Sequence, residues 1–296
     1  MRILVTGASG LLGNAVAEAA VEAGHQVIAV SNTNPATVIG VARAELIEGT
    51  DGDAFTGLCC GLRPAVIINC AALSNPASVD ERPEEAQAIN VAMPGMLAGL
   101  AYELDARFLH ISTDMVFDGL AEHPYGAGDA TNPSNLYGQT KLDSEDEVLE
   151  TYPAGSAVLR IPILMGNSPG GGRSLHEKLL GAIRDGGRPK LFTDEIRQPC
   201  SVTNVASVLL ELAVRRELTG VFHWAGADRM SRYDIGLAIV RKFGLPEDSV
   251  EAVSLRDDPA FARRPARLTF DTGPLEAALE TRPAGFAEQL AELRAI

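Results

Sequence analysis

The residues best suited to catalysis in this chain are Tyr137 and Lys141, because no other tyrosine has a lysine four residues later. On a helix this spacing places both side chains on one face. A phenol titrates near about 10, and a neighbouring ammonium favours its ionised form. A tyrosine tuned in this way can exchange a proton with a carbonyl oxygen. The pair therefore predicts chemistry on a carbonyl group, and the alternative is a surface tyrosine beside a chance lysine.

Two hydroxyl residues, Ser112 and Thr113, lie at the end of a predicted strand upstream of Tyr137. In a parallel sheet the carboxyl ends of the strands line the ligand crevice. A hydroxyl at that edge can hydrogen-bond the reacting carbonyl beside Tyr137. Adjacent strand residues face opposite ways, so only one of the two points into the crevice. The alternative is an ordinary polar strand end.

A glycine turn with the spacing GxxGxxG follows the first predicted strand and opens a helix. Glycines let the backbone approach a pyrophosphate, whose charge meets the positive end of the helix. This context predicts a dinucleotide site, although a tight turn without a ligand has the same pattern. The residues expected to contact the dinucleotide are Gly7, Ser9, Gly10, Leu11, Leu12 and Gly13. A nicotinamide in this site would supply the hydride for carbonyl reduction, and Lys141 would hold its ribose hydroxyls.

The end of the second predicted strand favours NADP(H) over NAD(H). Dinucleotide folds often carry an acid there that binds the adenosine ribose, and this chain has none. Hydroxyl and amide groups take its place and are expected to accept a 2′-phosphate, although the loop holds no Arg or Lys. These residues are Ser31, Asn32 and Thr33. Asp51, together with Thr50, is a candidate for binding the adenine amino group.

The elements that must position these residues alternate between strand and helix. Strands are predicted at 1–6, 26–30, 44–47, 65–69, 107–112 and 156–160, and helices at 11–23, 53–62, 84–104 and within 133–151. Such alternation predicts an α/β fold, a Rossmann-type doubly wound parallel sheet with helices on both faces. We expect residues 1–162 to form the dinucleotide-binding domain.

The regular alternation of strand and helix patterns ends after Pro162, and a Gly-rich loop follows at residues 168–174. Helices are predicted at 175–185, 203–216 and 231–243, short strands at 221–226 and 250–255, and a further helix near the end. Residues 163–296 are therefore expected to form a smaller substrate-binding lobe. This lobe looks too broken to fold alone, so its contacts should be interleaved with the first domain.

Composition excludes several kinds of partner. The 296 residues carry 25 Lys and Arg against 39 Asp and Glu, for a net charge of −14, which disfavours binding to nucleic acid or to an anionic membrane. Without a long apolar run or a signal peptide, the chain is expected to be cytoplasmic. Four cysteines without a CxxC pair and five histidines without metal-ligand spacing predict reduced thiols and no catalytic metal.

Several motifs together resemble an extended short-chain dehydrogenase/reductase, and are most similar to its dTDP-4-dehydrorhamnose reductase branch. They are the glycine turn, Asn69-Cys70-Ala71-Ala72, the segment 112–119 (STDMVFDG) and the segment 137–142 (YGQTKL), followed in the expected order by 197–199, 221–226 and 263–265. The resemblance covers nearly the whole chain.

This resemblance implies that Thr113, Tyr137 and Lys141 form the catalytic set. It implies NAD(P)H-dependent reduction of a 4-keto group on a nucleotide-linked deoxysugar, with Ala71, Ala72 and Pro162 along the cofactor. The substrate diphosphate would need local arginines. The candidate substrate residues are Asp114, Met115, Arg173, Arg197 and Arg264. Met115 stands where the family commonly has a tyrosine, and no tryptophan follows the sixth strand, which puts the dTDP-sugar in question.

Two other functions stay open. Relatives also act as NAD-dependent sugar-nucleotide epimerases or dehydratases with an extra acid, a role that Asp114 could take. Others are non-catalytic NADP-binding regulatory subunits, such as the partner of methionine adenosyltransferase, although Tyr137 and Lys141 argue against this. Residues 142–150 carry five acids in nine positions, which disfavours the helical dimer common among such reductases. We expect a monomer, or a dimer that does not use the Tyr137 helix.

Overall fold

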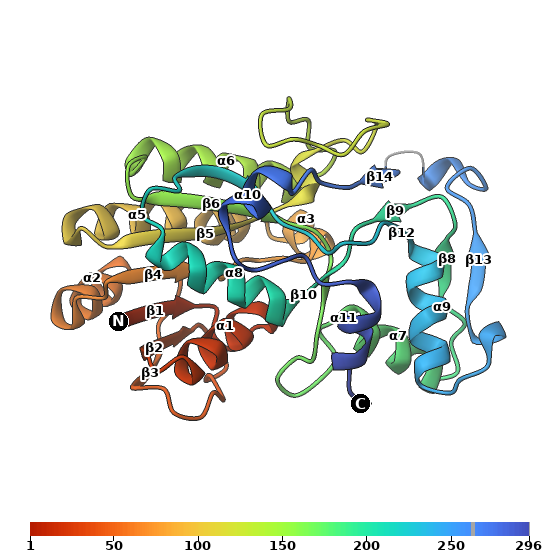
Figure 1. Ribbon diagram of the computed structural model, residues 1–296, viewed down its shortest axis with the longest axis horizontal. Helices are drawn as coiled ribbons and strands as arrows, with labels where there is room; N and C mark the ends of the chain where they lie inside the picture. Colours follow the sequence, from red (N-terminus) through yellow and green to blue (C-terminus); the bar gives the residue numbers. More distant parts are fainter. Residues whose placement is uncertain (262–263, 296) are drawn as a thin grey trace.

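A seven-stranded parallel sheet forms the centre of the computed structural model, which describes residues 1–261 and 264–295 (Figure 1). The strand order is β11-β6-β5-β4-β1-β2-β3, so the chain reverses direction across the sheet between β1 and β4. Ligands bind at such reversal points in doubly wound sheets. The predicted Rossmann-type fold is confirmed. The strands are β1 (Arg2–Thr6), β2 (Gln26–Ser31), β3 (Arg43–Leu46), β4 (Val66–Asn69), β5 (Arg107–Thr113), β6 (Ser156–Ile161) and β11 (Gly220–His223).

Apolar side chains on both faces of the sheet explain why helices cover both. Ile3 and Val5 of β1 pack towards α1 (Leu11–Glu22) and α8 (Val202–Val214). Leu4 between them packs on the other face, against α2 (Gly52–Leu62) and α5 (Met93–Leu104). Successive strand residues point to opposite faces, so an unbroken apolar run requires two covering layers.

The helix predicted at 84–104 is divided into three segments. A short helix, α4 (Pro83–Ala86), leads into a π-helical segment, η1 (Gln87–Ala92), before α5 begins at Met93. Pro94 lies in the first turn of α5, where its missing N–H costs little. The helix α3 (Pro76–Glu81), which the sequence patterns did not predict, precedes these segments.

The longest of the described helices is α6 (Leu136–Thr151), which carries Tyr137 and Lys141. Val148 faces the core, whereas Asp146, Glu147 and Glu150 are exposed. The absence of a dimer through this helix stays a prediction. None of the helices in the described parts of the chain has the length and apolar character that crossing a bilayer requires.

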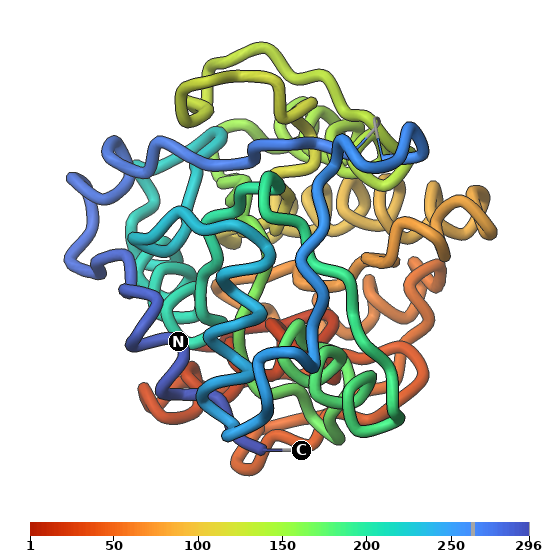
Figure 2. The backbone as a smooth tube through the Cα atoms, turned by 90° about the vertical axis from the view of Figure 1, so that its right-hand side faces the viewer, coloured from red at the N-terminus to blue at the C-terminus, as the bar shows by residue number. Residues whose placement is uncertain are grey.

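The second half of the chain forms a lobe of helices and very short strands beside the sheet, to the right in Figure 1 and facing the viewer in Figure 2. Its helices are α7 (Leu175–Arg184), α9 (Arg232–Lys242) and α11 (Phe286–Glu292), whereas α10 (Gly273–Ala278) lies over the sheet, where Leu275 packs in the same core cluster as α1 and α8. Its strands pair as β7 (Leu164–Met165) with β10 (Cys200–Ser201), β8 (Lys190–Phe192) with β13 (Glu251–Val253), and β9 (Ile196–Arg197) between β12 (Met230–Ser231) and β14 (Arg267–Leu268). Strands of two or three residues carry too little periodicity to be predicted.

Besides α10, two further elements from the second half of the chain pack against elements of the first half. The strand β11 pairs with β6 at the edge of the main sheet, and α8 packs against α1. Trp224, just after β11, is fully buried and donates its indole N–H to Asn204. The boundary near residue 162 therefore divides the sequence without dividing the sheet.

Candidate active site

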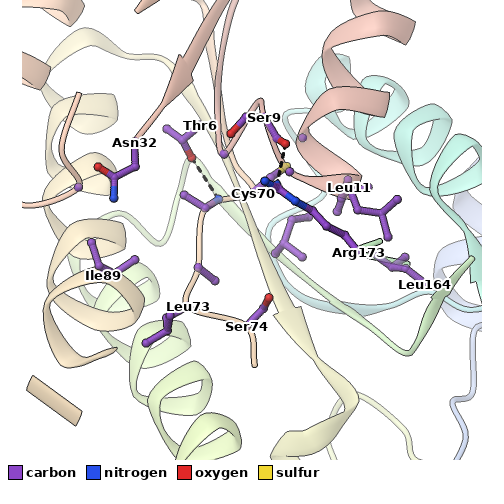
Figure 3. Close-up of a pocket in the computed structure, with 18 of the residues that line it drawn as sticks. Thr6, Ser9, Leu11, Asn32, Cys70, Leu73, Ser74, Ile89, Leu164 and Arg173 are labelled. Atoms are coloured by element: carbon purple, nitrogen blue, oxygen red, sulfur yellow. Dashed lines mark hydrogen bonds between the residues drawn. The ribbon is translucent and has the colours of Figure 1, made fainter. Parts of the chain in front are cut away.

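A cavity of about 910 Å³ lies at the carboxyl ends of the central strands and extends to the second lobe. Most of the predicted cofactor and catalytic residues line it. These are Gly7, Ser9, Gly10, Leu11, Leu12, Gly13, Ser31, Asn32, Thr33, Ala71, Ala72, Thr113, Tyr137, Lys141 and Pro162. Figure 3 shows Asn32 and Ile89 on one side of this cavity and Arg173 and Leu164 on the other. Residues from distant parts of the sequence thus line the same cavity.

The glycine turn can be built only from glycines at its two ends. Gly7 has φ +66°, and a Cβ there would lie 2.8 Å from the backbone of Cys70. A Cβ on Gly13 would lie 2.2 Å from the carbonyl oxygen of Gly7. No side chain caps the first turn of α1, since its N-cap is Gly10. The free N–H groups of that turn are therefore available to an anion.

The adenosine end of the cavity combines an apolar slot with an unsatisfied hydroxyl. The Oγ atom of Ser31 is buried and has no partner among the described residues. Ile47, Ile89 and Met93 supply apolar wall, and a Cβ on Gly49 would lie 2.5 Å from Ile89. A flat apolar slot beside an orphaned hydroxyl fits an adenosine.

Asp51 does not line this cavity. Its carboxylate accepts the N–H of Ala54 at 2.9 Å and so caps α2. An aspartate just before a helix is a common N-cap, which accounts for its position without a ligand. Its predicted contact with adenine stays a prediction that the described geometry does not favour.

At the catalytic end, the structure distinguishes the two adjacent hydroxyls. Thr113 lines the cavity with Tyr137 and lowers the pKa of its phenol, whereas Ser112 donates to the buried carboxylate of Glu145. The Thr113 hydroxyl also accepts the N–H of Met115 at 3.2 Å and lies 3.2 Å from a carboxylate oxygen of Asp114. Alternation along β5 therefore turns Thr113 towards Tyr137, as the resemblance implied.

The pKa of Tyr137 differs from the sequence-based expectation. Burial, reinforced by the carboxylate of Asp114, raises the pKa of Tyr137 to about 12, and Thr113 only partly opposes this. The expected lowering by Lys141 is not found; the Nζ atom of Lys141 lies 3.0 Å from Nε2 of His110. The phenol is consequently held protonated, as an acid.

Lys141 ends a buried chain of polar side chains. Thr6 donates to Oδ1 of Asn69 at 2.5 Å, and Nδ2 of Asn69 lies 3.0 Å from Nδ1 of His110. If Nδ1 accepts this bond, Nε2 carries the ring proton and donates it to the Ser144 hydroxyl at 2.9 Å, since that hydroxyl itself donates to the carbonyl of Lys141. Burial lowers the pKa of Lys141 to about 8.

His110 was expected to be a satisfied core residue, and it is buried with both ring nitrogens bonded. Sequence patterns did not reveal that one of its partners is Lys141. They also missed Asn90, in the π-helical segment. Its amide accepts the N–H of Leu73 at 2.8 Å and donates to Thr140 at 3.1 Å, which ties the cavity wall to α6.

Arg173 lies at the glycine turn. Its guanidinium donates to the carbonyl of Ser9 at 2.8 Å, and Figure 3 shows this contact. The Gly-rich loop that carries it is held by Glu177, whose carboxylate accepts the N–H groups of Arg173 and Ser174, each at 2.9 Å. Arg173, predicted as a substrate ligand, is therefore placed beside the expected pyrophosphate site.

The other predicted substrate residues do not line the cavity. Arg197 and Arg264 both bind Glu195, Met115 packs in an apolar cluster with Phe117, and Asp114 is buried with its pKa raised to about 6 by burial. Arg263 lies outside the described residues. Two cations that the sequence patterns missed, Lys178 and Arg232, line the cavity instead.

Cys70 lines the cavity, but its thiol is unsuited to act as a nucleophile. Burial raises the pKa of Cys70 to about 12, so the reactive thiolate is scarce. Within residues 1–261 and 264–295, no group of three His, Cys, Asp or Glu side chains is placed to hold a metal ion.

Comparison with known proteins places this site in a family context. The model of one family, the RmlD substrate binding domain, matches residues 1–295. Methionine adenosyltransferase 2 subunit beta of Rattus norvegicus is 36% identical over 289 residues, which cover 93% of this chain and 81% of the relative. A probable low-salt glycan biosynthesis reductase of Haloferax volcanii is 30% identical over 302 residues, or 100% and 98% of the two chains.

Solved structures agree with the architecture. A dTDP-4-dehydrorhamnose reductase of Clostridium acetobutylicum superposes with a TM-score of 0.86 at 28% identity, over 99% of this chain and 98% of that one. A reductase of the same name from Bacillus anthracis, solved in complex with NADP, gives a TM-score of 0.86 at 22% identity, over 98% and 97%. At that identity the second likeness concerns the fold alone.

Proposed function

Because the chain belongs to the RmlD substrate binding domain family of extended short-chain dehydrogenases/reductases, we propose that it reduces a ketone with NAD(P)H. One observation carries this proposal. The glycine turn at Gly7 and the set Thr113, Tyr137 and Lys141 line a single cavity. The glycine turn does not need a phenol and an amine nearby for its own conformation. A single ligand that contacts the turn as well as Tyr137 and Lys141 explains why they share a cavity.

The cofactor we propose is NADP(H). Gly7 to Gly13 and the guanidinium of Arg173 would hold the pyrophosphate, and Ala71, Ala72 and Pro162 would lie along the rest. The orphaned hydroxyl of Ser31, with Asn32 and Thr33 beside it, would bind a 2′-phosphate. When bound, a reduced nicotinamide would supply the hydride.

In the proposed reaction Tyr137 donates its phenolic proton to the ketone oxygen, while Thr113 hydrogen-bonds the same oxygen. A pKa of about 12 keeps the phenol protonated at neutral pH, which is the form that reduction consumes. Lys141, positioned by His110, would bind ribose hydroxyls and stabilise the phenolate left after proton transfer.

The substrate we propose is a sugar-like ketone linked to a nucleotide. The similarity to a dTDP-4-dehydrorhamnose reductase of Clostridium acetobutylicum supports this linkage, and the similarity to a glycan biosynthesis reductase of Haloferax volcanii supports a sugar. A NAD-dependent epimerase or dehydratase would need a further acid at the substrate. Asp114 is the candidate, but it does not line the cavity, which makes reduction the better supported reaction.

NADPH oxidation with dTDP-4-dehydrorhamnose and with simple ketones tests this function. Tyr137→Phe should reduce kcat by roughly 10²–10⁴-fold while NADPH binding is retained, because only the proton donor is lost. Tyr102→Phe, at an exposed tyrosine, is the matched control and should keep full activity. Full turnover by Tyr137→Phe would contradict the proposed mechanism.

The second candidate is an NADP-binding regulatory subunit, favoured by the 36% identity to methionine adenosyltransferase 2 subunit beta. This function requires the cofactor site but no proton donor. Tight NADPH binding without turnover of any ketone, together with an unchanged affinity in Tyr137→Phe, would support it over the reductase.

A further inference from the structure

Three arginines of the second lobe surround one buried carboxylate, and only two of them bind it. Arg197 donates to Glu195 at 2.8 Å and Arg264 donates to it at 3.1 Å. Arg232 gives Glu195 only its backbone N–H, at 2.9 Å to the carbonyl oxygen. Glu195 is thus saturated by two guanidinium groups, and the third cation is left over.

The side chain of Arg232 has no hydrogen bond or ion pair with any described residue. Its Nη1 atom is buried and unpartnered. Burial lowers the pKa of Arg232; the carboxylate of Glu195 opposes this, while the cations Arg197 and Arg264 act in the same direction as burial. An arginine stays charged all the same, so the buried Nη1 carries a desolvation cost that no hydrogen bond to a described residue offsets. An incoming anion would remove that cost.

Arg232 faces the catalytic end of the cavity. It lines the same cavity as Tyr137, and it begins α9 directly after the strand β12, which pairs with β9. Thr113 and Tyr137 line this cavity together with Arg232, whereas Glu195, whose carbonyl oxygen accepts the Arg232 backbone N–H, does not. The pyrophosphate site at the glycine turn already has its own arginine, Arg173.

The charge of the cavity wall agrees with an anionic ligand at this end. The second lobe contributes Arg173, Lys178 and Arg232 to the wall. Among the described lining residues the one acid is Glu85, which is paired with Arg82 at 2.9 Å. A positive wall in a chain of net charge −14 is a local feature that concentrates anions.

We propose that Arg232 binds an oxyanion of the ketone substrate, either a phosphate group or a carboxylate. The planar guanidinium matches both groups with two parallel hydrogen bonds. The inference rests on the proposed function and narrows it, because it makes the substrate an anionic ketone and Arg232 a residue that selects it.

Steady-state kinetics of Arg232→Gln and Arg232→Lys test this with three ketones: dTDP-4-dehydrorhamnose, the carboxylate 5-keto-gluconate and neutral cyclohexanone. For the anionic substrate that the wild type prefers, KM should rise about 10–100-fold in Arg232→Gln and less in Arg232→Lys, with kcat within a few-fold. Activity on cyclohexanone and the Kd for NADPH should not change. Whether the wild type prefers dTDP-4-dehydrorhamnose or 5-keto-gluconate shows whether Arg232 binds a phosphate or a carboxylate. Arg241→Gln, a surface arginine of the same helix paired with Glu247, is the control.

An unchanged KM for both anionic ketones would overturn the inference, as would an equal loss with cyclohexanone or a weaker NADPH complex. If the wild type turns over no ketone, the proposed reductase activity is refuted, but the anion site can still be tested by ligand-induced shifts of the melting temperature.

In the presence of NADPH, dTDP or pyrophosphate should raise the melting temperature of the wild type but not that of Arg232→Gln. Equal shifts in both proteins would refute the anion site. Without ligands Arg232→Gln should melt no lower than the wild type, which shows that it folds.

Discussion

Glu145 and Glu195 are both buried carboxylates bound by arginine, yet their surroundings differ. Glu145 accepts Nε and Nη2 of Arg160 and the hydroxyl of Ser112, and the free nitrogen of Arg160 reaches His223 at 3.3 Å. Both charged groups of that network, Glu145 and Arg160, have partners on the sheet or on the helix α6 that covers it. Glu195 instead lies among more guanidinium groups than it can bind. The first network is closed and holds the fold, whereas the second is open and leaves a cation for a ligand.

The difference follows from the elements that build each region. Ser112 and Arg160 are direct neighbours on β5 and β6, and Glu145 reaches them from α6, so a long parallel ladder fixes all three. Glu195 and Arg264 lie in connecting loops next to two-residue strands, and Arg232 is the first residue of α9. Short elements allow the lobe to present side chains that the core of the sheet could not leave unpaired.

Glu145→Gln should have the largest effect on stability. Removing one charge from a buried pair leaves the other uncompensated, which costs about 3–5 kcal/mol of unfolding free energy. Glu195→Gln should cost less, because the guanidinium of Arg264 is half exposed to water and the carboxylate of Asp114 still acts on the buried Arg197. Urea denaturation of both variants measures the comparison. Equal losses would show that the second network is as closed as the first.

The sequence allowed much of the closed region to be predicted. Apolar runs predicted the six strands of the first half, and an arginine within the sixth of them, Arg160, pairs with Glu145. Its partner could not be named, because the register between α6 and β6 is a tertiary property. The choice between Ser112 and Thr113 depended in the same way on which face of β5 each one takes.

The open region could not be predicted to the same depth. Arg197 and Arg264 were expected to bind substrate, and both instead bind Glu195. A sequence shows how many cations a lobe carries, but not which of them its own acids neutralise. Arg232 was missed because it stands inside an unremarkable helical pattern, and only the pairing of β12 with β9 brings it to the cavity.

Replacing the buried histidines His110 and His223 should have effects on stability that are smaller than that of Glu145→Gln. His110→Phe should lower the unfolding free energy by about 2–4 kcal/mol, since Asn69 and Lys141 each lose a buried partner. It should also raise the Kd for NADPH, because Lys141 is no longer positioned. His223→Phe, which removes two ring hydrogen bonds outside the cavity, is the control. Urea melts and NADPH titration separate the two effects, and an equal change of Kd in both variants would refute a specific role of His110.

The smallest effect concerns Asp114, which lies between the two regions and interacts with both Tyr137 and Arg197. Burial raises the pKa of Asp114 to about 6 from 3.8, so the folded chain binds a proton more tightly than the unfolded chain. The stability contributed by this proton is complete below pH 3.8 and is lost as the pH rises to about 6. One pKa unit corresponds to about 1.4 kcal/mol, so the wild type should lose about 1–3 kcal/mol relative to Asp114→Asn over this range. Urea melts at pH 4 and pH 7 measure the difference. A constant gap between the two proteins would mean that Asp114 is ionised throughout, and that Arg197 reaches across from the open network to neutralise it.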